Sequence, residues 1–407
     1  MATARRTSLP LTVVLLGFTS LFTDVGTEMI FPLLPVFLSE VLGAAPVTIG
    51  LIEGAADTVS SLVKLVSGVM ADAMPRRKPL VLAGYGLASA ARPFVALATR
   101  PWHVLAVRVT DRVGKGLRSS PRDALIADAA GDRAGRAFGF HQAMDNAGAV
   151  VGPLVATALI AMGLSLRQVF AIAVVPGIIA TGLVAAVREP RRTSTSTSTP
   201  TPTPTSTPTS TPLLTPTLLS YLGVLALFSL GNSSDAFLLL RARSLGIRTE
   251  TIPLLWATLN LSKVLWAYLG GSLADRLPRA PLIAGGWLVF AIVYAGLGAA
   301  TATWHVWSLF LVYGIFYGLT EPVEKALVKD LAGAEQRGRA YGAYNFVVGV
   351  TVLPAGLMTG ALWHAIGPRA ALDVDAAFAC AACVALLSWD TWRRGRAREG
   401  AKPPGDN

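Results

Sequence analysis

Carboxylates spaced four residues apart inside apolar stretches are the side chains of this sequence that could do chemistry. Asp24 and Glu28 form one such pair, and Glu53 and Asp57 form another in the next apolar stretch. Residues at this spacing lie one helical turn apart on the same face. An ionised group at the centre of a bilayer costs about 2.5–3.5 kcal/mol to insert, so charged residues there are functional candidates. A carboxylate shielded from water takes up a proton more readily, and the chemistry indicated is proton binding and release.

A cation that moves relative to these carboxylates could switch their proton affinity. Arg112 lies near the middle of the fourth apolar stretch and is the candidate for this role. Asp145 follows His141 by four residues in the fifth stretch. The alternative is a static network of buried ion pairs that fixes the register of the helices. The sequence leaves both interpretations open.

The second half of the chain carries fewer polar residues in its apolar stretches. The many charged groups of the first half cannot all face lipid, so we expect an internal, partly hydrated cavity that receives them. The candidates in the second half are Asn232, Asp235, Asn260, Lys263 and Asn345.

The overall composition predicts a membrane protein. Of the 407 residues, 53% are hydrophobic and 14% are charged, and the mean hydropathy is +0.54. Soluble proteins carry about 25% charged residues. The net charge of +11 is concentrated in one set of loops, and no basic, aromatic-rich soluble module is present to bind nucleic acid. We therefore expect the chain to be embedded in lipid and not to bind nucleic acid.

Enzymatic and metal chemistry find little support in the residues. The four histidines are far apart in sequence, and Cys380 and Cys383 lie within the last apolar stretch. A redox or metal-binding cysteine pair would need polar or electropositive surroundings. We predict that the chain is not an enzyme, holds no metal and uses no cofactor.

The elements that must position the candidates are membrane-spanning helices, each of about 20 residues or more. The first segment, about 11–38, is expected to be one long helix. Five more follow before a Thr/Ser/Pro-rich tract, and six more follow the tract. They are expected at about 46–72, 79–99, 102–127, 137–163 and 167–187, and then at 217–242, 251–275, 280–301, 304–330, 338–363 and 371–391.

This order predicts an all-α integral membrane protein with 12 transmembrane helices in two pseudo-symmetric six-helix bundles. Residues 1–192 form the first bundle and 217–392 the second. Residues 193–216 form a linker, because repeated Thr-Pro and Ser-Thr cannot bury a core. Residues 393–407 form a tail. Lys and Arg concentrate in the loops on one side, and such loops face the cytoplasm. We therefore expect both termini in the cytoplasm and the chain in the inner (cytoplasmic) membrane of the cell.

An internal repeat supports the duplication. Gly68 to Lys78 reads GVMADAMPRRK, and Gly271 to Arg279 reads GSLADRLPR. Each copy ends an apolar stretch with Gly and then Ala-Asp, and continues into a basic turn with proline. Parallel repeats of this kind are one way in which secondary transporters are built, with the binding site between the halves.

With six plus six helices and this turn, the chain resembles the major facilitator superfamily over nearly its whole length. The family pattern reads Gly-x-x-x-Asp-Arg-x-Gly-Arg-Arg/Lys; here Ala73 and Pro75 replace the usual Arg and Gly. The resemblance implies that the turn is a cytoplasmic gate, a charged latch that controls the change between access states. The matching residues are Gly68, Asp72, Arg76, Arg77, Lys78, Gly271, Asp275, Arg276 and Arg279.

Two partial motifs extend the resemblance. Arg112 to Gly116 is similar to the motif of the family's fourth helix, whose Arg is implicated in proton coupling. Gly148, Gly152 and Pro153 are similar to the fifth-helix motif associated with antiporters. Small residues let helices approach closely, and a proline inside a helix bends it.

The resemblance implies a monomeric secondary transporter that moves small organic molecules by alternating access, driven by a proton gradient. The antiporter-like motif favours export. The alternative is proton-coupled uptake of a sugar or an organic acid anion, for which Arg92, Arg108, Arg112 and Lys263 would suit an anionic substrate.

Overall fold

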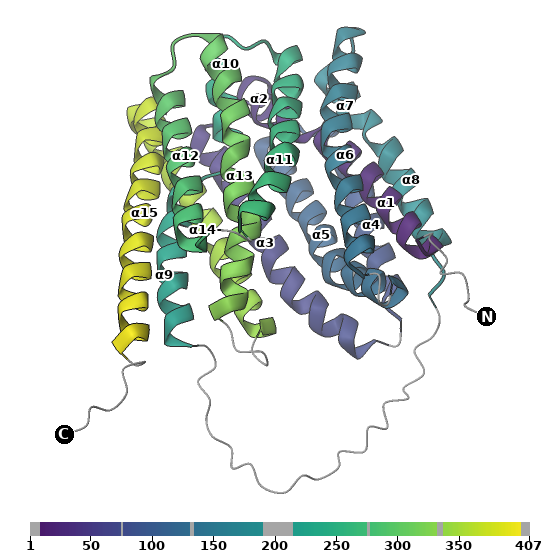
Figure 1. Ribbon diagram of the computed structural model, residues 1–407. Helices are drawn as coiled ribbons and strands as arrows, with labels where there is room; N and C mark the ends of the chain where they lie inside the picture. Colours follow the sequence, from purple (N-terminus) through teal and green to yellow (C-terminus); the bar gives the residue numbers. More distant parts are fainter. Residues whose placement is uncertain are drawn as a thin grey trace, which may run out of the picture. The chain divides into compact units, whose positions relative to one another are not determined.

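The computed structural model describes residues 9–74, 76–130, 134–189, 215–274, 277–331 and 337–399 (Figure 1). The described residues are nearly all helical and include no strand. The first half contains α1 (Leu11–Glu28), η1 (Phe31–Leu33), α2 (Leu34–Val36), η2 (Phe37–Val41), α3 (Pro46–Ala73), α4 (Lys78–Ala91), η3 (Arg92–Leu97), α5 (Pro101–Ala130), α6 (Ala134–Ala161), α7 (Leu166–Ile172) and α8 (Val174–Ala186). The second half contains α9 (Pro216–Gly231), α10 (Ala236–Ser244), η5 (Thr249–Thr251), α11 (Ile252–Ala274), α12 (Arg279–Ala299), α13 (Thr303–Leu331), α14 (Arg337–Ile366) and α15 (Pro368–Glu399).

Nine stretches of the described chain are long and apolar enough to cross a bilayer. They coincide with nine of the predicted segments. The helices α3, α5 and α11 fall at the other three, with 28, 30 and 23 residues. The expected all-α membrane fold is confirmed, and the total of twelve crossings stays a prediction.

Two compact units make up the chain. Unit 1 consists of Met1–Leu42, Val59–Thr205 and Thr249–Ala257, and unit 2 of Gly43–Thr58, Ser206–Arg248 and Thr258–Asn407. The helices α3 and α11 therefore contribute to both units. The predicted linker, residues 193–216, lies outside the described residues except for its last two.

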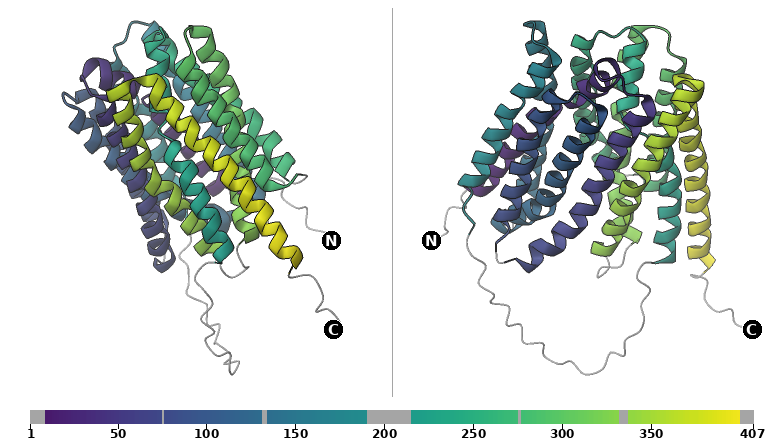
Figure 2. Two further views of the ribbon diagram at one scale, coloured as in Figure 1. Left: turned by 90° about the vertical axis from the view of Figure 1, so that its left-hand side faces the viewer. Right: turned by 180° about the vertical axis from the view of Figure 1, so that it is seen from behind.

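Each unit packs its helices in the same pattern. In unit 1, α1 contacts α6 and α8, while α4 contacts α5 and α8. In unit 2, α9 contacts α14 and α15, while α12 contacts α13 and α15. Figure 2 shows α15 beside α9. Counted in chain order within each half, the first segment packs on the fifth and sixth, and the third on the fourth and sixth. The repeat seen in the sequence is thus a repeat of packing.

The first segment of each half is broken. The predicted first segment, about 11–38, matches one membrane-length stretch, Leu11–Val41, but it is not one regular helix, because α1 ends at Glu28 and continues as the short pieces η1, α2 and η2. Pro32 and Pro35 lack the N–H that a regular helix needs there. In the second half, α9 ends at Gly231 and α10 begins at Ala236.

The last helix runs further than predicted. α15 continues to Glu399, into the segment that the sequence suggested as a tail. Arg393 and Arg394 each pair with Asp390, at 2.9 and 2.7 Å. Such pairs one turn apart stabilise a helix.

Candidate functional site

Two glycines of α6 allow that helix to approach α1 at the acidic turn of Asp24 and Glu28. A Cβ atom added to Gly148 would lie 2.9 Å from the Asp24 Cβ, and one added to Gly152 would lie 2.8 Å from the Glu28 Cβ. Real Cβ contacts are not this short, so only glycine fits at either place. Pro153, the third residue of the predicted motif, lies inside α6. The motif therefore determines how close α6 comes to the carboxylates.

This close crossing joins two carboxyl groups from different helices. The side chains of Asp145 of α6 and Asp24 of α1 act directly on each other. The Ser20 hydroxyl, one turn before Asp24, also donates to Asp145. Two carboxylates that face each other cannot both remain ionised at little cost, so such a pair shares a proton. The sequence predicted both residues as candidates but gave no indication that they pair.

Cations of α5 act electrostatically on this acid pair. The charges acting on Asp24 include Lys115 and Arg118, and Arg122 acts on Asp145. Arg118 also lies over the Tyr85 ring, 4.4 Å from its centroid. Arg112, the predicted cation, is buried and is among the charges that act on Asp111. The role of Arg112 in proton coupling stays a prediction, and the α5 cations that act on Asp24 are Lys115 and Arg118.

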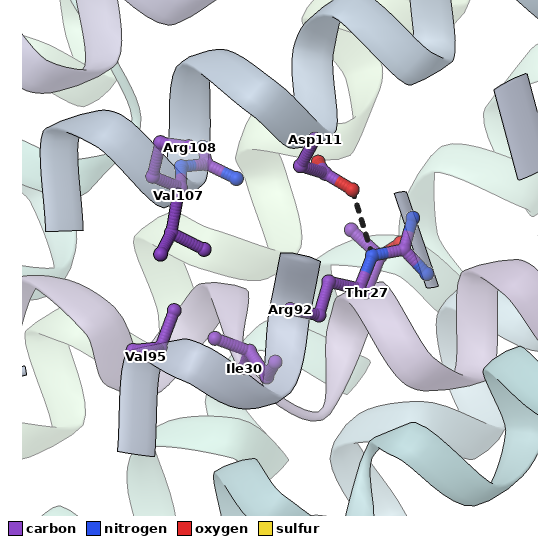
Figure 3. Close-up of a pocket in the computed structure, with 7 residues that line it drawn as sticks. All are labelled: Thr27, Ile30, Arg92, Val95, Val107, Arg108 and Asp111. Carbon is purple, nitrogen blue, oxygen red and sulfur yellow. Dashed lines mark hydrogen bonds and ion pairs between the residues drawn. The ribbon is translucent and has the colours of Figure 1, made fainter. Parts of the chain in front are cut away.

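A buried ion pair lies beside a small cavity in the same unit (Figure 3). Arg92 Nε donates to Asp111 Oδ1 at 2.8 Å, and Arg92 Nη1 donates to the Thr23 carbonyl at 3.1 Å. Thr27 and Arg108 line the cavity together with this pair. Its volume of about 20 Å³ is enough for one water molecule. An organic substrate does not fit there, so the pair fits a role in fixing the helices.

Glu28 has a partner at the start of α11. The Trp256 indole Nε1 donates to Glu28 Oε2 at 2.6 Å, and the Trp256 ring lies 5.1 Å from the Phe31 ring. Trp256 belongs to the short stretch of the second half that packs within unit 1. The indole donor to Glu28 was not predicted from the sequence.

The second predicted carboxylate pair, Glu53 and Asp57, lies in the part of α3 that belongs to unit 2. Glu53 is buried and Asp57 is half-buried. Thr58 Oγ1 donates to the Gly349 carbonyl of α14 at 2.8 Å. A Cβ atom on Gly54 would lie 2.7 Å from the Leu353 Cα. This pair therefore belongs to a close contact between α3 and α14, in a different unit from Asp24.

In unit 2 the break between α9 and α10 holds a second polar cluster. Asp235 accepts hydrogen bonds from the hydroxyls of Tyr313 and Tyr317, at 3.0 and 2.8 Å. Lys263 Nζ lies 3.9 Å from Asp235 Oδ2 and 3.7 Å from the centroid of the Tyr317 ring. The structure brings together the predicted Asp235 and Lys263. The tyrosines were missed, although their spacing of four residues in one segment could have indicated a shared face.

The three predicted amides have separate surroundings. Asn232 ends α9, with its N–H bonded to the Phe228 carbonyl at 3.1 Å. Asn260 is buried in α11. Asn345 is exposed, and its side chain donates to the Tyr341 carbonyl of its own helix at 2.9 Å.

The repeated basic turn makes matching ion pairs in the two units. Arg77 pairs with Asp128 at 2.6 Å in unit 1, and Arg279 pairs with Asp330 at 2.7 Å in unit 2. Glu189 also accepts from the backbone N–H groups of Arg77 and Lys78, at 2.9 and 2.7 Å. Each turn is thus tied to the end of a later helix of its own unit. The role of Glu189 was not predicted.

For the other predicted gate residues, the structure gives a position but no ion pair, or they lie outside the described residues. Gly68 lies in α3 and Gly271 in α11, and Arg76 is exposed. Asp72 lies in α3, but its side chain is outside the described residues, as are Asp275 and Arg276 entirely.

Comparison with known sequences gives a family and several relatives. Residues 16–312 and 236–406 match the Major Facilitator Superfamily. An uncharacterized MFS-type transporter of Methanocaldococcus jannaschii is 31% identical over 358 residues, which is 86% of this chain and 88% of that protein. The multidrug resistance protein MdtH of Photorhabdus laumondii is 31% identical over 144 residues, 35% of this chain and 36% of that protein.

Solved structures agree on the fold. A peptide transporter, POT, in complex with sulfate has a TM-score of 0.77 at 15% identity, covering 97% of this chain and 96% of its own. A bacterial homologue of the human lysosomal transporter Spinster has a TM-score of 0.69 at 15% identity, covering 93% of this chain and 94% of its own. The chain belongs to the Major Facilitator Superfamily, and it is an integral membrane transporter and not an enzyme.

Proposed function

We propose that this transporter exports small organic molecules from the cytoplasm across the cell membrane in exchange for protons. The observation that carries the proposal is the pairing of Asp24 with Asp145 at the close crossing of α1 and α6. A shared proton leaves this pair with a single negative charge, and its loss would leave two negative charges side by side. A conformational change that alters the distance from the Asp24–Asp145 pair to Lys115 or Arg118 changes the free-energy cost of losing the shared proton. Proton release is thereby coupled to the change of access state.

Two features support export as the direction of transport. The Gly148-x-x-x-Gly152-Pro153 motif resembles that of antiporters, and it lies directly on the acidic turn of α1. Part of the chain is also similar to a protein named for multidrug resistance. Both favour exchange of an internal substrate for external protons.

The alternative is proton-coupled uptake of a sugar or an organic acid anion. An anion site would need cations that are free to bind the substrate. Arg92 and Lys263, two of the candidates, already pair with Asp111 and Asp235. Their charges are balanced within the protein, so the export interpretation is better supported.

We assign the remaining predicted residues by their surroundings. Asp235 and Lys263, with Tyr313 and Tyr317, form a polar surface suited to recognising a substrate with hydrogen-bonding groups. The other residues that we predict to take part in proton coupling or substrate binding are Glu28, Glu53, Asp57, Arg112, Asn232, Asn260 and Asn345. The ion pairs of Arg77 and Arg279 hold the basic turns that we propose as the cytoplasmic gate. The proton gradient is the energy source, no cofactor is used, and the monomer is the working unit.

Transport in everted membrane vesicles tests the proposal. Respiration acidifies the interior of such vesicles, and an exporter that exchanges its substrate for protons dissipates this gradient when a substrate is added. A panel of lipophilic cations, sugars and organic acids serves as the set of probes. We expect dissipation by at least one lipophilic compound. Dissipation by none of them, with proton-linked uptake of a sugar or acid in right-side-out vesicles, would establish the alternative.

Variants of the acid pair test the coupling site. We expect Asp24→Asn and Asp145→Asn each to abolish gradient-driven accumulation while substrate exchange without a gradient continues. Asp373→Asn is the control, because Asp373 is 47% exposed and pairs only loosely, at 3.7 Å, with Arg369. Normal gradient-driven transport by Asp24→Asn would refute the assignment of the coupling site.

A further inference from the structure

Asp375 in α15 is a buried carboxylate that the coupling pair does not involve. Its exposed fraction is 0%. Ser233 Oγ donates to Asp375 Oδ2 at 2.7 Å, and Thr359 Oγ1 lies 2.9 Å from Oδ1 and 3.1 Å from Oδ2. Both partners are hydroxyl groups without charge. Moving an ionised carboxylate out of water costs several kcal/mol unless a cation compensates it.

Among the described residues, no cation forms an ion pair with Asp375. On α15 itself, Arg369 is 74% exposed and lies nearest to Asp373. The break between α9 and α10 contributes Asp235, and α12 contributes Tyr294, neither of which is a cation. The helix α14 contributes Thr359. Among the described residues, the groups hydrogen-bonded to Asp375 are the hydroxyls of Ser233 and Thr359.

The location of Ser233 connects Asp375 to the substrate side of unit 2. Ser233 lies in the non-helical stretch between α9 and α10, and the Tyr294 hydroxyl donates to its carbonyl at 3.4 Å. Two residues later, Asp235 makes the contacts with Lys263 and the tyrosines described above. A change in the charge of Asp375 therefore acts directly on the segment that positions Asp235.

We propose that Asp375, Ser233 and Thr359 form a second proton-binding site, at which Asp375 is neutral at rest and exchanges its proton when the α9–α10 break rearranges. On release, the carboxyl O–H bond breaks and the proton passes to water. The two hydroxyls continue to donate to the carboxylate that remains. The exchange step rests on the proposed proton-coupled function, whereas the resting protonation does not.

The geometry favours a proton over a metal cation. Metal ions bind between oxygen atoms and hold them apart, each oxygen at its own coordination distance. Here the hydroxyl oxygens of Ser233 and Thr359 are already in direct hydrogen-bond contact with the carboxylate. Sodium binding would require this cluster to open.

Infrared spectroscopy of the purified full-length protein in lipid tests the resting state. A protonated carboxylic acid has a carbonyl band separate from those of carboxylates and amides. We expect the wild-type spectrum at neutral pH to contain such a band that Asp375→Asn removes and Asp373→Asn keeps. No difference between wild type and Asp375→Asn would overturn the proposal. Loss of the band on adding sodium at constant pH would overturn it too, and would indicate a metal-cation site.

A second variant keeps the test valid if Asp375→Asn does not fold. Thr359→Val keeps the carboxyl group and removes one hydroxyl, so we expect the band to remain and to shift in frequency. An unshifted band would contradict the hydrogen bond from Thr359. Thermal unfolding of all variants shows whether each is folded.

Transport separates this inference from the proposed function. We expect Asp375→Asn to keep substrate exchange and to lose gradient-driven accumulation. If Asp375→Asn accumulates substrate as well as the wild type, the Asp375 proton is not exchanged during transport. That result would contradict the proposed exchange step. Asp24→Asn should keep the Asp375 band, so normal transport in Asp24→Asn would refute the coupling pair without affecting the infrared assignment.

Discussion

Arg77 and Arg279 show how equivalent residues of the repeat make the same bond in different surroundings. Each pairs with an aspartate, Asp128 or Asp330, at nearly the same distance. The Arg77 side chain is 6% exposed and the Arg279 side chain is 28% exposed. A buried charge depends strongly on its partner, while water compensates a more exposed one. The unit 1 pair is therefore expected to matter more for stability.

Removing each carboxylate tests this difference. We expect Asp128→Asn to lower the free energy of unfolding by about 1–3 kcal/mol, because Arg77 loses its ion pair where water hardly reaches. Asp330→Asn should cost less, because Arg279 can be hydrated. Thermal unfolding of both purified variants measures the difference. Equal losses, or a larger loss for Asp330→Asn, would contradict the role of burial.

At the scale of helices, the crossing of α1 and α6 explains why an acid pair can form at all. Side chains larger than hydrogen at Gly148 and Gly152 would separate the helices and, with them, Asp24 and Asp145. The breaks after α1 and α9 serve a related purpose. They interrupt the regular hydrogen bonding next to the polar residues of each first segment, and broken membrane helices of this kind mark binding sites in transporters.

Alanine at the two glycines tests the crossing. Gly148→Ala places a methyl group 2.9 Å from the Asp24 Cβ, and Gly152→Ala places one 2.7 Å from the Val25 carbonyl. We expect each to lower stability by about 1–3 kcal/mol, as for other overpacked interiors, and to impair coupling. Gly182→Ala is the matched control, because its Cβ would meet nothing within 4 Å. Thermal unfolding and vesicle transport are the measurements, and identical behaviour of Gly148→Ala and Gly182→Ala would refute the close approach.

For the whole molecule, the shared packing pattern of the two units makes the gene duplication visible in three dimensions. The first and third segments of each unit have the same partners. Two helices, α3 and α11, contribute to both units, so the units are not simply the two halves of the sequence. The excess of Lys and Arg in one set of loops predicts the orientation of the whole chain.

Cysteine labelling checks that orientation. The natural Cys380 and Cys383 are first replaced by Ala. In this background we expect a membrane-impermeant maleimide to label Ser198→Cys, in the Thr/Ser/Pro tract, only in everted vesicles. Thr301→Cys, which is exposed between α12 and α13, should be labelled only in right-side-out vesicles. The opposite pattern would overturn the predicted topology.

The sequence by itself determined the class of protein, the repeat and most of the charged candidates. Segment length, hydropathy and spacing of four residues are local properties, so they can be read from neighbouring residues. Family membership followed from the basic turn and the order of the segments. The break in the first helix was missed, although Pro32 and Pro35 are the local signal for it.

Only the tertiary structure decided which candidates meet. Asp24 and Asp145 come from different helices, and their contact depends on how closely α6 can approach α1. Asp375 lies near the predicted start of its segment, where a charged residue can reach water and is therefore not a notable feature of the sequence. Its burial becomes evident only in the structure, where Ser233 and Thr359 lie against it. Packing between helices distant in sequence sets these contacts, because the close approach of two backbones depends on both surfaces at once.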